Sequence, residues 1–143
     1  MLGWNRTQPS ENTPMPKRAL IPPALKDACA RAGMSPGILS DGHVFLTGVT
    51  GSAADGAMPV GDEAQFQACF DKIAAVLAEA GMGLDSIVEM TSYHVGLRGH
   101  FDVFDAVRLA RLSDPYPAWT AVEVAGLRRV GAVVEIRVIA TQD

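Results

Sequence analysis

The chain has 143 residues, of which 48% are hydrophobic and 20% are charged, and its formal net charge is −4 at pH 7. This length and composition predict one soluble globular domain, large enough for a hydrophobic core without staples. The acidic balance excludes a dominant nucleic-acid surface, because phosphate binding requires clustered Lys and Arg. The only basic pairs are Lys17-Arg18 and Arg128-Arg129, so we expect no nucleic-acid partner.

The cysteines and histidines are not spaced as metal ligands. Cys29 and Cys69 lie 40 positions apart, which indicates neither a disulfide framework nor a metal site, and we interpret them as buried or half-buried thiols. With three histidines and no ligand spacing, we expect no metal and no other cofactor. No run of eighteen apolar residues and no signal-peptide core is present, which predicts no membrane partner and a cytoplasmic location.

Residues 1–16 are predicted to form a flexible arm, since they contain Asn, Thr, Ser, Gln and three prolines and have no apolar period. Trp4 in this arm either docks on the body or stays partly exposed. Residues 17–143 are predicted to form a single domain. It begins with a brief strand over 17–21, followed by one or two helical turns over 24–32.

A β-hairpin is predicted over residues 38–50, ILSDGHVFLTGVT. Asp41-Gly42 supplies a two-residue turn between apolar flanks, which is a strong hairpin signal. The second strand is expected over 43–49. Gly48 within it indicates a bulge or a close approach of another group to the backbone. A small, polar loop is then expected over 52–59.

The clearest helix is predicted over residues 62–80. Asp62 and Glu63 favour its first turn, and Gly81 supplies a stop. Its large apolar residues recur every three or four positions and form one stripe, which we assign to the core. They are Phe66, Cys69, Phe70, Ile73, Val76 and Leu77.

An inner strand and a second helix are predicted next. The strand covers residues 84–95, with its side chains alternating between two faces. Residues 96–99 form a turn, and the second helix covers residues 101–112. On the strand, Ile87, Glu89, Thr91 and Tyr93 are expected on one face, and Val88, Met90, Ser92 and His94 on the other.

The C-terminal quarter, residues 116–140, predicts a second hairpin. The strand-like runs TAVEV and AVVEIRVIA flank a basic turn over 126–131. Each strand has a mixed second face, and together these faces carry Trp119, Glu123, Glu135 and Arg137. Such a face is either solvated or covered by another subunit that supplies partners for its charges.

The predicted order is strand, hairpin, helix, strand, helix, hairpin. This order indicates an α+β fold, a two-layer mixed β-sheet with two helices on one face. Nothing in the sequence covers the other face. A bare sheet face with apolar and charged side chains predicts closed homo-oligomerisation.

Several segments between about Lys17 and Ala140 together match one known family pattern. They are Val44-Phe45-Leu46-Thr47-Gly48, residues 61–81 with Ala64-Gln65 and with LAEAG at the end, Leu84-Asp85-Ser86-Ile87-Val88, Pro117-Ala118, Val122-Glu123-Val124-Ala125 with Leu127, and Val134-Glu135-Ile136. On these segments the chain resembles the Rid family, also called YjgF, the reactive intermediate deaminases once labelled L-PSP endoribonucleases. The resemblance implies a chorismate-mutase-like fold, a homotrimer and a small-molecule pocket at each subunit interface.

The chain departs from the family pattern at four site positions. The family Arg that clamps a substrate carboxylate follows Pro-Ala, and here it is Trp119. The Cys two positions later is Ala121, the Tyr of the loop before the first hairpin is Gly37, and an Asn of the second helix falls near Asp105. The sequence therefore resembles an Arg-less branch of the family.

Two family features are retained. Thr47-Gly48 stands where the family usually has Ser-Gly, and Glu135 is the Glu that the family uses to position the attacking water. Arg137 replaces a second acid. The resemblance thus implies Glu135 as the catalytic residue. The candidate substrate-binding residues are Thr47, Gly48, His94, Trp119, Ala121 and Arg137.

The implied reaction is hydrolysis of a C=N bond in a small imine or enamine. Glu135 could act as acid and base if an apolar interface raises its pKa; alternatively it pairs with Arg137 or with an Arg of a neighbouring subunit. Histidine ordinarily titrates near neutrality, so His94 could also act as an acid or base. A lone strand His with no Asp or Ser partner is more often structural, and His100 is expected to be solvated or capping.

Trp119 leaves two functional readings open. Replacing Arg by Trp removes a fork of five donors and adds one indole N–H and a flat apolar ring. The first reading is an enzyme with a flatter or less charged substrate than 2-iminopropanoate, in which Trp119→Arg would restore activity on that compound. The second is a non-catalytic small-molecule-binding or regulatory trimer. In either case Trp119 could instead be a packing residue at the interface.

Overall fold

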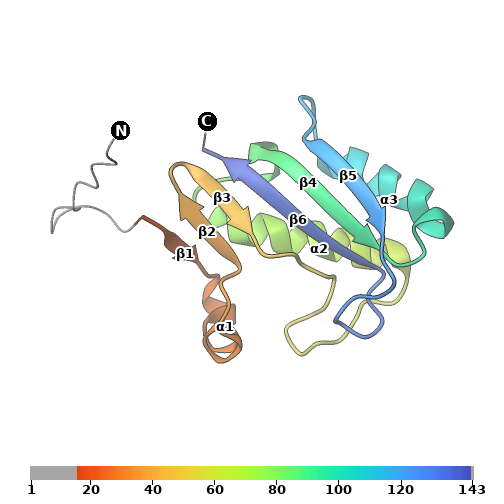
Figure 1. Cartoon of the computed structure of the whole chain (residues 1–143), viewed down its shortest axis with the longest axis horizontal. Coiled ribbons are helices and arrows are strands. Elements are labelled where there is room, and N and C mark those ends of the chain that lie inside the picture. The colour runs from red at the N-terminus through yellow and green to blue at the C-terminus, as the bar shows by residue number, and fades with distance from the viewer. Residues whose placement is uncertain (1–15, 143) are drawn as a thin grey trace, which may run out of the picture.

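The computed structural model describes residues 16–142, so the predicted flexible arm, with Trp4, lies outside the described residues apart from Pro16. One six-stranded sheet has the order β1-β2-β3-β6-β4-β5, and α2 and α3 cover one of its faces (Figure 1). The predicted mixed α+β architecture is confirmed. The elements are β1 (Arg18–Leu20), α1 (Lys26–Ala32), β2 (Gly37–Ser40), β3 (His43–Leu46), α2 (Asp62–Ala78), β4 (Ile87–His94), α3 (Leu97–Arg111), β5 (Ala118–Glu123) and β6 (Val134–Thr141).

The first hairpin forms where its turn predicts it. β2 and β3 pair antiparallel, with Ser40 opposite His43. Asp41 and Gly42 have φ values of 51° and 73°, the left-handed pair that a two-residue primed turn requires. The second strand ends at Leu46, earlier than expected, and the chain meets the sheet again only through a bridge between Val49 and Ile136.

The helix predicted over 62–80 is α2, and it supplies six of the nineteen buried residues of the core cluster. All six residues of its predicted apolar stripe are buried, and Phe66 and Phe70 are fully enclosed. They pack against α3 through Phe104, whose ring meets that of Phe66 edge to face at 5.1 Å. α3 itself begins at Leu97, four residues before the predicted start, because Gly96 takes a left-handed conformation and ends the turn there.

β4 is the predicted inner strand, but its first residues lie on different faces from those expected. A register shift separates Ile87 from Glu89 along the pairing with β6. Ile87 is therefore buried and Val88 is exposed, the reverse of simple alternation. Beyond the shift the expected alternation holds, with Met90, Ser92 and His94 buried towards the helices.

The predicted C-terminal hairpin is wrong. β5 and β6 are not neighbours, because β4 lies between them, parallel to β5 and antiparallel to β6. The unit β4–α3–β5 is a crossover, and such a unit places its second strand beside its first in parallel. β6 then enters on the other side of β4, and β5 becomes the edge of the sheet (Figure 1).

Candidate functional site

Glu135 lies on the sheet face that is turned away from α2 and α3, against the backbone of Gly48. Its neighbours Val134 and Ile136 are buried on the helix side. A Cβ atom built on Gly48 would lie 2.8 Å from Glu135 Oε2, so a glycine is required for this approach. Val49 and Ile136 exchange two hydrogen bonds of 2.9 Å, which fix Gly48 in this register.

The open face around Glu135 is polar and carries no counter-ion from the same subunit. Tyr93 stands opposite Glu135, and Thr91 stands opposite Arg137. Across residues 16–142, no Lys, Arg or His nitrogen lies within 4.0 Å of the Glu135 carboxylate. The alternative pair between Glu135 and Arg137 is therefore not formed within the subunit, and the carboxylate is left for a ligand, water or a neighbouring subunit.

Thr47 ties this strand end to the preceding loop. Its hydroxyl donates a 2.7 Å hydrogen bond to the carbonyl of Ser35, and its amide donates one of 2.9 Å to Pro36. The hydroxyl proton is thus committed to the backbone, and a ligand could use only its oxygen as an acceptor.

Trp119 lies on the other face of the sheet from Glu135, which corrects the expectation that both share the mixed face. In the parallel register it stands beside Met90, a core residue, and Ala121 stands beside the buried Ser92. The indole packs between β5 and α3. It stacks on Phe101 with an angle of 7° between the planes, and the guanidinium carbon of Arg108 lies 4.3 Å from its centre.

The polar groups around Trp119 are all paired. Its Nε1–H donates a 2.8 Å hydrogen bond to Ser92 Oγ. Arg108 donates from Nε and Nη2 to Asp105 at 3.0 and 2.6 Å, so the residue near the family's Asn position is an ion-pair partner. Trp119 therefore has no free donor for a substrate carboxylate within the subunit.

His94 is fully buried and belongs to a chain of hydrogen bonds. Its Nε2 lies 2.8 Å from Ser92 Oγ and its Nδ1 lies 2.9 Å from His100 Nε2. His100 is also buried, and its Nδ1 is 3.8 Å from Asp62. The expectations that His94 has no Ser partner and that His100 is solvated are wrong, since α3 begins early and turns His100 inwards.

Burial keeps both rings neutral near pH 7. Desolvation, helped by the neighbouring His100, lowers the pKa of His94 to about 4. Desolvation also lowers the pKa of His100, against the opposing effect of Asp62. In residues 16–142, no group of three His, Cys, Asp or Glu side chains is placed to hold a metal ion.

The predicted site residues thus fall into two groups on opposite faces. Gly48 and Glu135 meet directly on the open face, where Arg137 also lies and which Thr47 adjoins. His94, Trp119 and Ala121 lie on the helix side, near the β5 edge. One subunit does not join the two groups into one pocket.

Sequence reasoning missed a polar role for α2. Gln65 and Lys72 make hydrogen bonds to the segments that carry Gly48 and Glu135. Cys69, assigned only to the apolar stripe, contacts the carbonyl of Val49 with its sulfur at 3.6 Å. The available signal was the spacing of Gln65, Cys69 and Lys72 on one side of a helix whose other inward residues are apolar.

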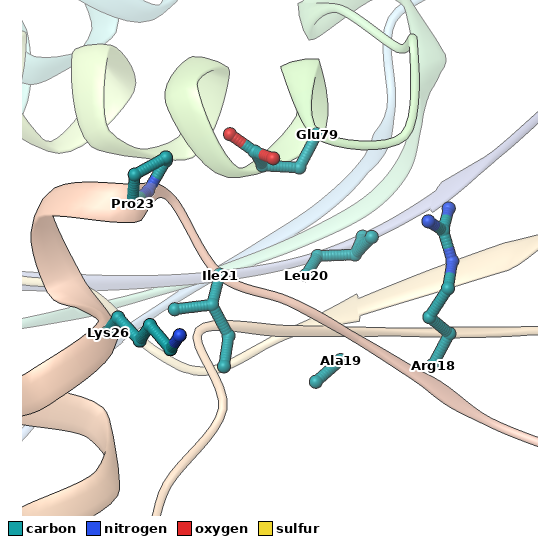
Figure 2. A pocket seen from close by; sticks show the side chains of 7 residues that line it. All are labelled: Arg18, Ala19, Leu20, Ile21, Pro23, Lys26 and Glu79. Atoms are coloured by element: carbon teal, nitrogen blue, oxygen red, sulfur yellow. The ribbon is translucent and has the colours of Figure 1, made fainter.

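Two hollows of the surface lie away from Glu135. A groove of about 450 Å³ runs along β1 to the end of α2, with Arg18, Lys26 and Glu79 around it (Figure 2). A second hollow lies at the start of α2, beside Val103 of α3. Neither is lined by a predicted site residue. No helix within residues 16–142 is long and apolar enough to cross a membrane.

Comparison with known proteins places the chain in a known family. The family model described as Endoribonuclease L-PSP matches residues 25–142. The chain belongs to this family, the Rid/YjgF family, as the resemblance in its sequence predicted.

Individual relatives agree. The RutC family protein YjgH of Escherichia coli K12 is 34% identical over 125 residues, which are 87% of this chain and 94% of that protein. A solved structure of protein YJGH has a TM-score of 0.81 at 33% identity, covering 89% of this chain and 97% of its own. A RidA crystal structure from an Antarctic Psychrobacter species has a TM-score of 0.70 at 33% identity, covering 75% and 86%.

Proposed function

We propose that this protein is a hydrolase of the C=N bond in a small imine or enamine, and that it acts at a pocket between the subunits of a homotrimer. The observation that carries the proposal is the Glu135 carboxylate, which lies against Gly48 on an open sheet face without a cation from its own subunit. Membership of the Rid/YjgF family supports the reaction class.

The separation of the site residues supports an interface pocket. Trp119 and Ala121 lie at the edge strand β5, and Glu135 lies on a central strand of the opposite face. A closed ring brings unlike surfaces of successive subunits together. In such a ring the β5 edge of one subunit would cover the open face of the next, and the pocket would have Glu135 on one wall and the β5–α3 edge on the other.

The proposed chemistry needs one acid–base group. Glu135 accepts a proton from water as the oxygen adds to the imine carbon, and it passes this proton to the nitrogen to give the carbinolamine. It then accepts the proton of the carbinolamine hydroxyl and delivers it to the nitrogen, so that the C–N bond breaks, C=O forms and ammonia leaves. The balance is one imine and one water for one carbonyl compound and one ammonia, with no cofactor required.

We propose a substrate without a strong carboxylate anchor. Trp119 replaces the expected Arg, its N–H is committed to Ser92, and its ring already packs against α3. On the open face, Arg137 is the one exposed cation of β6. The substrate is thus expected to be less acidic than 2-iminopropanoate, unless Arg137 binds its carboxylate.

The same packing favours the second candidate, a non-catalytic small-molecule-binding or regulatory trimer. A Trp119 ring that fills the β5–α3 edge would leave the pocket smaller and without the family's charge clamp. Catalytic turnover that depends on Glu135 separates the two candidates.

The test compares two imines made in situ. A dehydratase supplies 2-iminopropanoate, and an amine oxidase supplies an imine without a carboxylate; carbonyl release is followed for wild type, Glu135→Gln and buffer. We expect acceleration of the second imine by wild type, little of the first, and none with Glu135→Gln. Equal rates with wild type and Glu135→Gln on both imines would overturn the hydrolase proposal and favour the binding trimer.

Oligomeric state is measured separately by light scattering after size-exclusion chromatography. A trimeric mass is expected for wild type. A monomer at micromolar concentration would contradict the interface pocket, whatever the rates.

A further inference from the structure

Three polar side chains of α2 hold the two backbone segments that meet at Gly48 and Glu135. Gln65, Cys69 and Lys72 are four and three positions apart, so they project from one side of the helix. We call them the α2 clamp. Gln65 and Cys69 are buried and Lys72 is half-buried, so these are interior contacts.

Gln65 fixes the entry to β6. Its Nε2 donates a 3.0 Å hydrogen bond to the Gly131 carbonyl, and its Oε1 accepts one of 3.0 Å from the Val133 amide. Both ends of the amide are therefore used. The backbone is set two residues before Glu135.

Lys72 fixes the other segment. Its ammonium donates to the carbonyls of Thr50 and Ser52 at 2.8 and 3.0 Å and lies 3.4 Å from Ser52 Oγ. The three N–H groups of a lysine thus have three oxygen partners. Gly51 lets this segment lie directly on α2, since a Cβ atom there would come within 2.7 Å of the Gln65 carbonyl.

The contact of the Lys72 ammonium with the backbone of Thr50 and Ser52 contributes more than van der Waals packing. Lys72 is desolvated enough that burial lowers its pKa, and it has no acidic partner within 4.0 Å in residues 16–142. An apolar residue would avoid this desolvation but would leave two carbonyls without their donor. The charge therefore serves to hold the backbone of Thr50 and Ser52.

We propose that Lys72 is a positioning residue for Glu135: its ammonium holds residues 50–52 on α2, and this segment holds Gly48 against the Glu135 carboxylate. The link is the pair of hydrogen bonds between Val49 and Ile136, each adjacent in the chain to one of the two site residues. The effect on catalysis rests on the proposed function, whereas the effect on the backbone does not.

The backbone effect is tested by amide hydrogen exchange in Lys72→Met. Exchange at Val49 and Ile136 is expected to rise by about tenfold or more, the factor given by the loss of one hydrogen bond to a charged group. Amides of Val124 and Gln142, bonded to His94 and Gly42, should keep their rates. Lys72→Arg should restore part of the protection, and Lys26→Met, at an exposed lysine of α1, is the matched control.

Unchanged exchange at Val49 and Ile136 in Lys72→Met would overturn the proposal, even if imine hydrolysis is never found. If Lys72→Met fails to fold, Lys72→Gln, which removes the charge but keeps two N–H donors, takes its place with the same expectations.

The catalytic effect is tested by a double-mutant cycle on the imine that wild type hydrolyses. Lys72→Met is expected to lower kcat by about tenfold with KM little changed, and to have a smaller effect in the Glu135→Asp background, which keeps a carboxylate but already displaces it. Additive losses would show that Lys72 does not act through Glu135. Absence of wild-type turnover would refute only the proposed function. The exchange experiment would still show whether Lys72 holds the backbone at Val49 and Ile136.

Discussion

The indole N–H of Trp119 donates a 2.8 Å hydrogen bond to the hydroxyl of Ser92 on the neighbouring strand β4. The same hydroxyl lies 2.8 Å from His94 Nε2, and His94 in turn contacts His100. If Ser92 donates to His94 Nε2, then His94 Nδ1–H donates to His100, whose own Nδ1–H faces Asp62. With both imidazole rings neutral, each donor in this chain then has an acceptor. Trp119, which replaces the family's Arg, is thereby connected to a chain of buried polar side chains.

Ser92→Ala is expected to lower the free energy of unfolding by about 1–3 kcal/mol. The substitution leaves the Trp119 N–H and one His94 nitrogen buried without a partner, and unpaired buried groups cost that much. Urea unfolding at pH 7.5 measures the loss. Ser113→Ala is the control, because the Ser113 hydroxyl is exposed and bonds only Asp85; equal losses in both variants would contradict the chain described above.

Trp119→Arg is expected to destabilise the fold rather than simply to restore a carboxylate site. The new guanidinium would lie beside that of Arg108, now 4.3 Å from the indole centre, and like charges at that range repel. The double variant Trp119→Arg/Arg108→Gln should therefore unfold at higher urea than the single one and is the proper form for assays with 2-iminopropanoate. A single variant as stable as wild type would show that the space between β5 and α3 accommodates both cations.

The sequence predicts the parts of this fold that depend on local chemistry. Asp41-Gly42 defines a turn by its own conformational preference, and the stripe from Phe66 to Leu77 defines a helix and its buried side. Prediction from the sequence fails where strand pairing depends on segments that are far apart in the chain. Two adjacent strand-like runs favour a hairpin, and only the packing of α3 on the sheet makes β5 a partner of β4 instead.

The candidate site divides in the same way. Glu135 and Gly48 could be named from family motifs, and the structure brings them into contact. The sheet face on which Trp119 lies could not be predicted. Alternation along a strand shows which residues share a face, but it does not show which face the helices cover. The expected hairpin put Trp119 on the same mixed face as Glu135, whereas β4 lies between the two strands and Trp119 stands beside the buried Met90. The roles of Gln65 and Lys72 depend on loops whose path no local pattern predicts.

Acid is expected to destabilise the protein through the buried histidines. The pKa of His94 is about 4 in the folded state against 6.5 ordinarily, so below pH 6.5 the unfolded chain binds a proton that the folded chain does not. The contribution of His94 to the free energy of unfolding is then constant above about pH 6.5. It falls by up to roughly 3 kcal/mol as the pH drops towards 4. His100, whose pKa is also lowered, adds to the fall in the same direction.

Urea unfolding at intervals between pH 7.5 and 4.5 measures this dependence. His94→Gln should lower stability at pH 7.5 but flatten the dependence on pH, whereas His43→Gln, at an exposed strand residue, should leave the slope of wild type. A slope that is the same in His94→Gln as in wild type would assign the acid effect to other groups.

Gly48→Ala is expected to impair the site far more than the fold. An added Cβ would meet Glu135 Oε2 at 2.8 Å, so the carboxylate must move, and a shift near 1 Å in a reacting group costs about a hundredfold in rate. The side chain of Glu135 is on the open face and can move without opening the core, so the midpoint of urea unfolding should change little. Carbonyl release from the imine that wild type hydrolyses gives the rate. Gly126→Ala is the matched control, because nothing lies within 4 Å of its added Cβ. If Gly48→Ala keeps the wild-type rate while Glu135→Gln loses it, the carboxylate acts from a position that does not depend on Gly48, and the close approach of the two residues has no catalytic role.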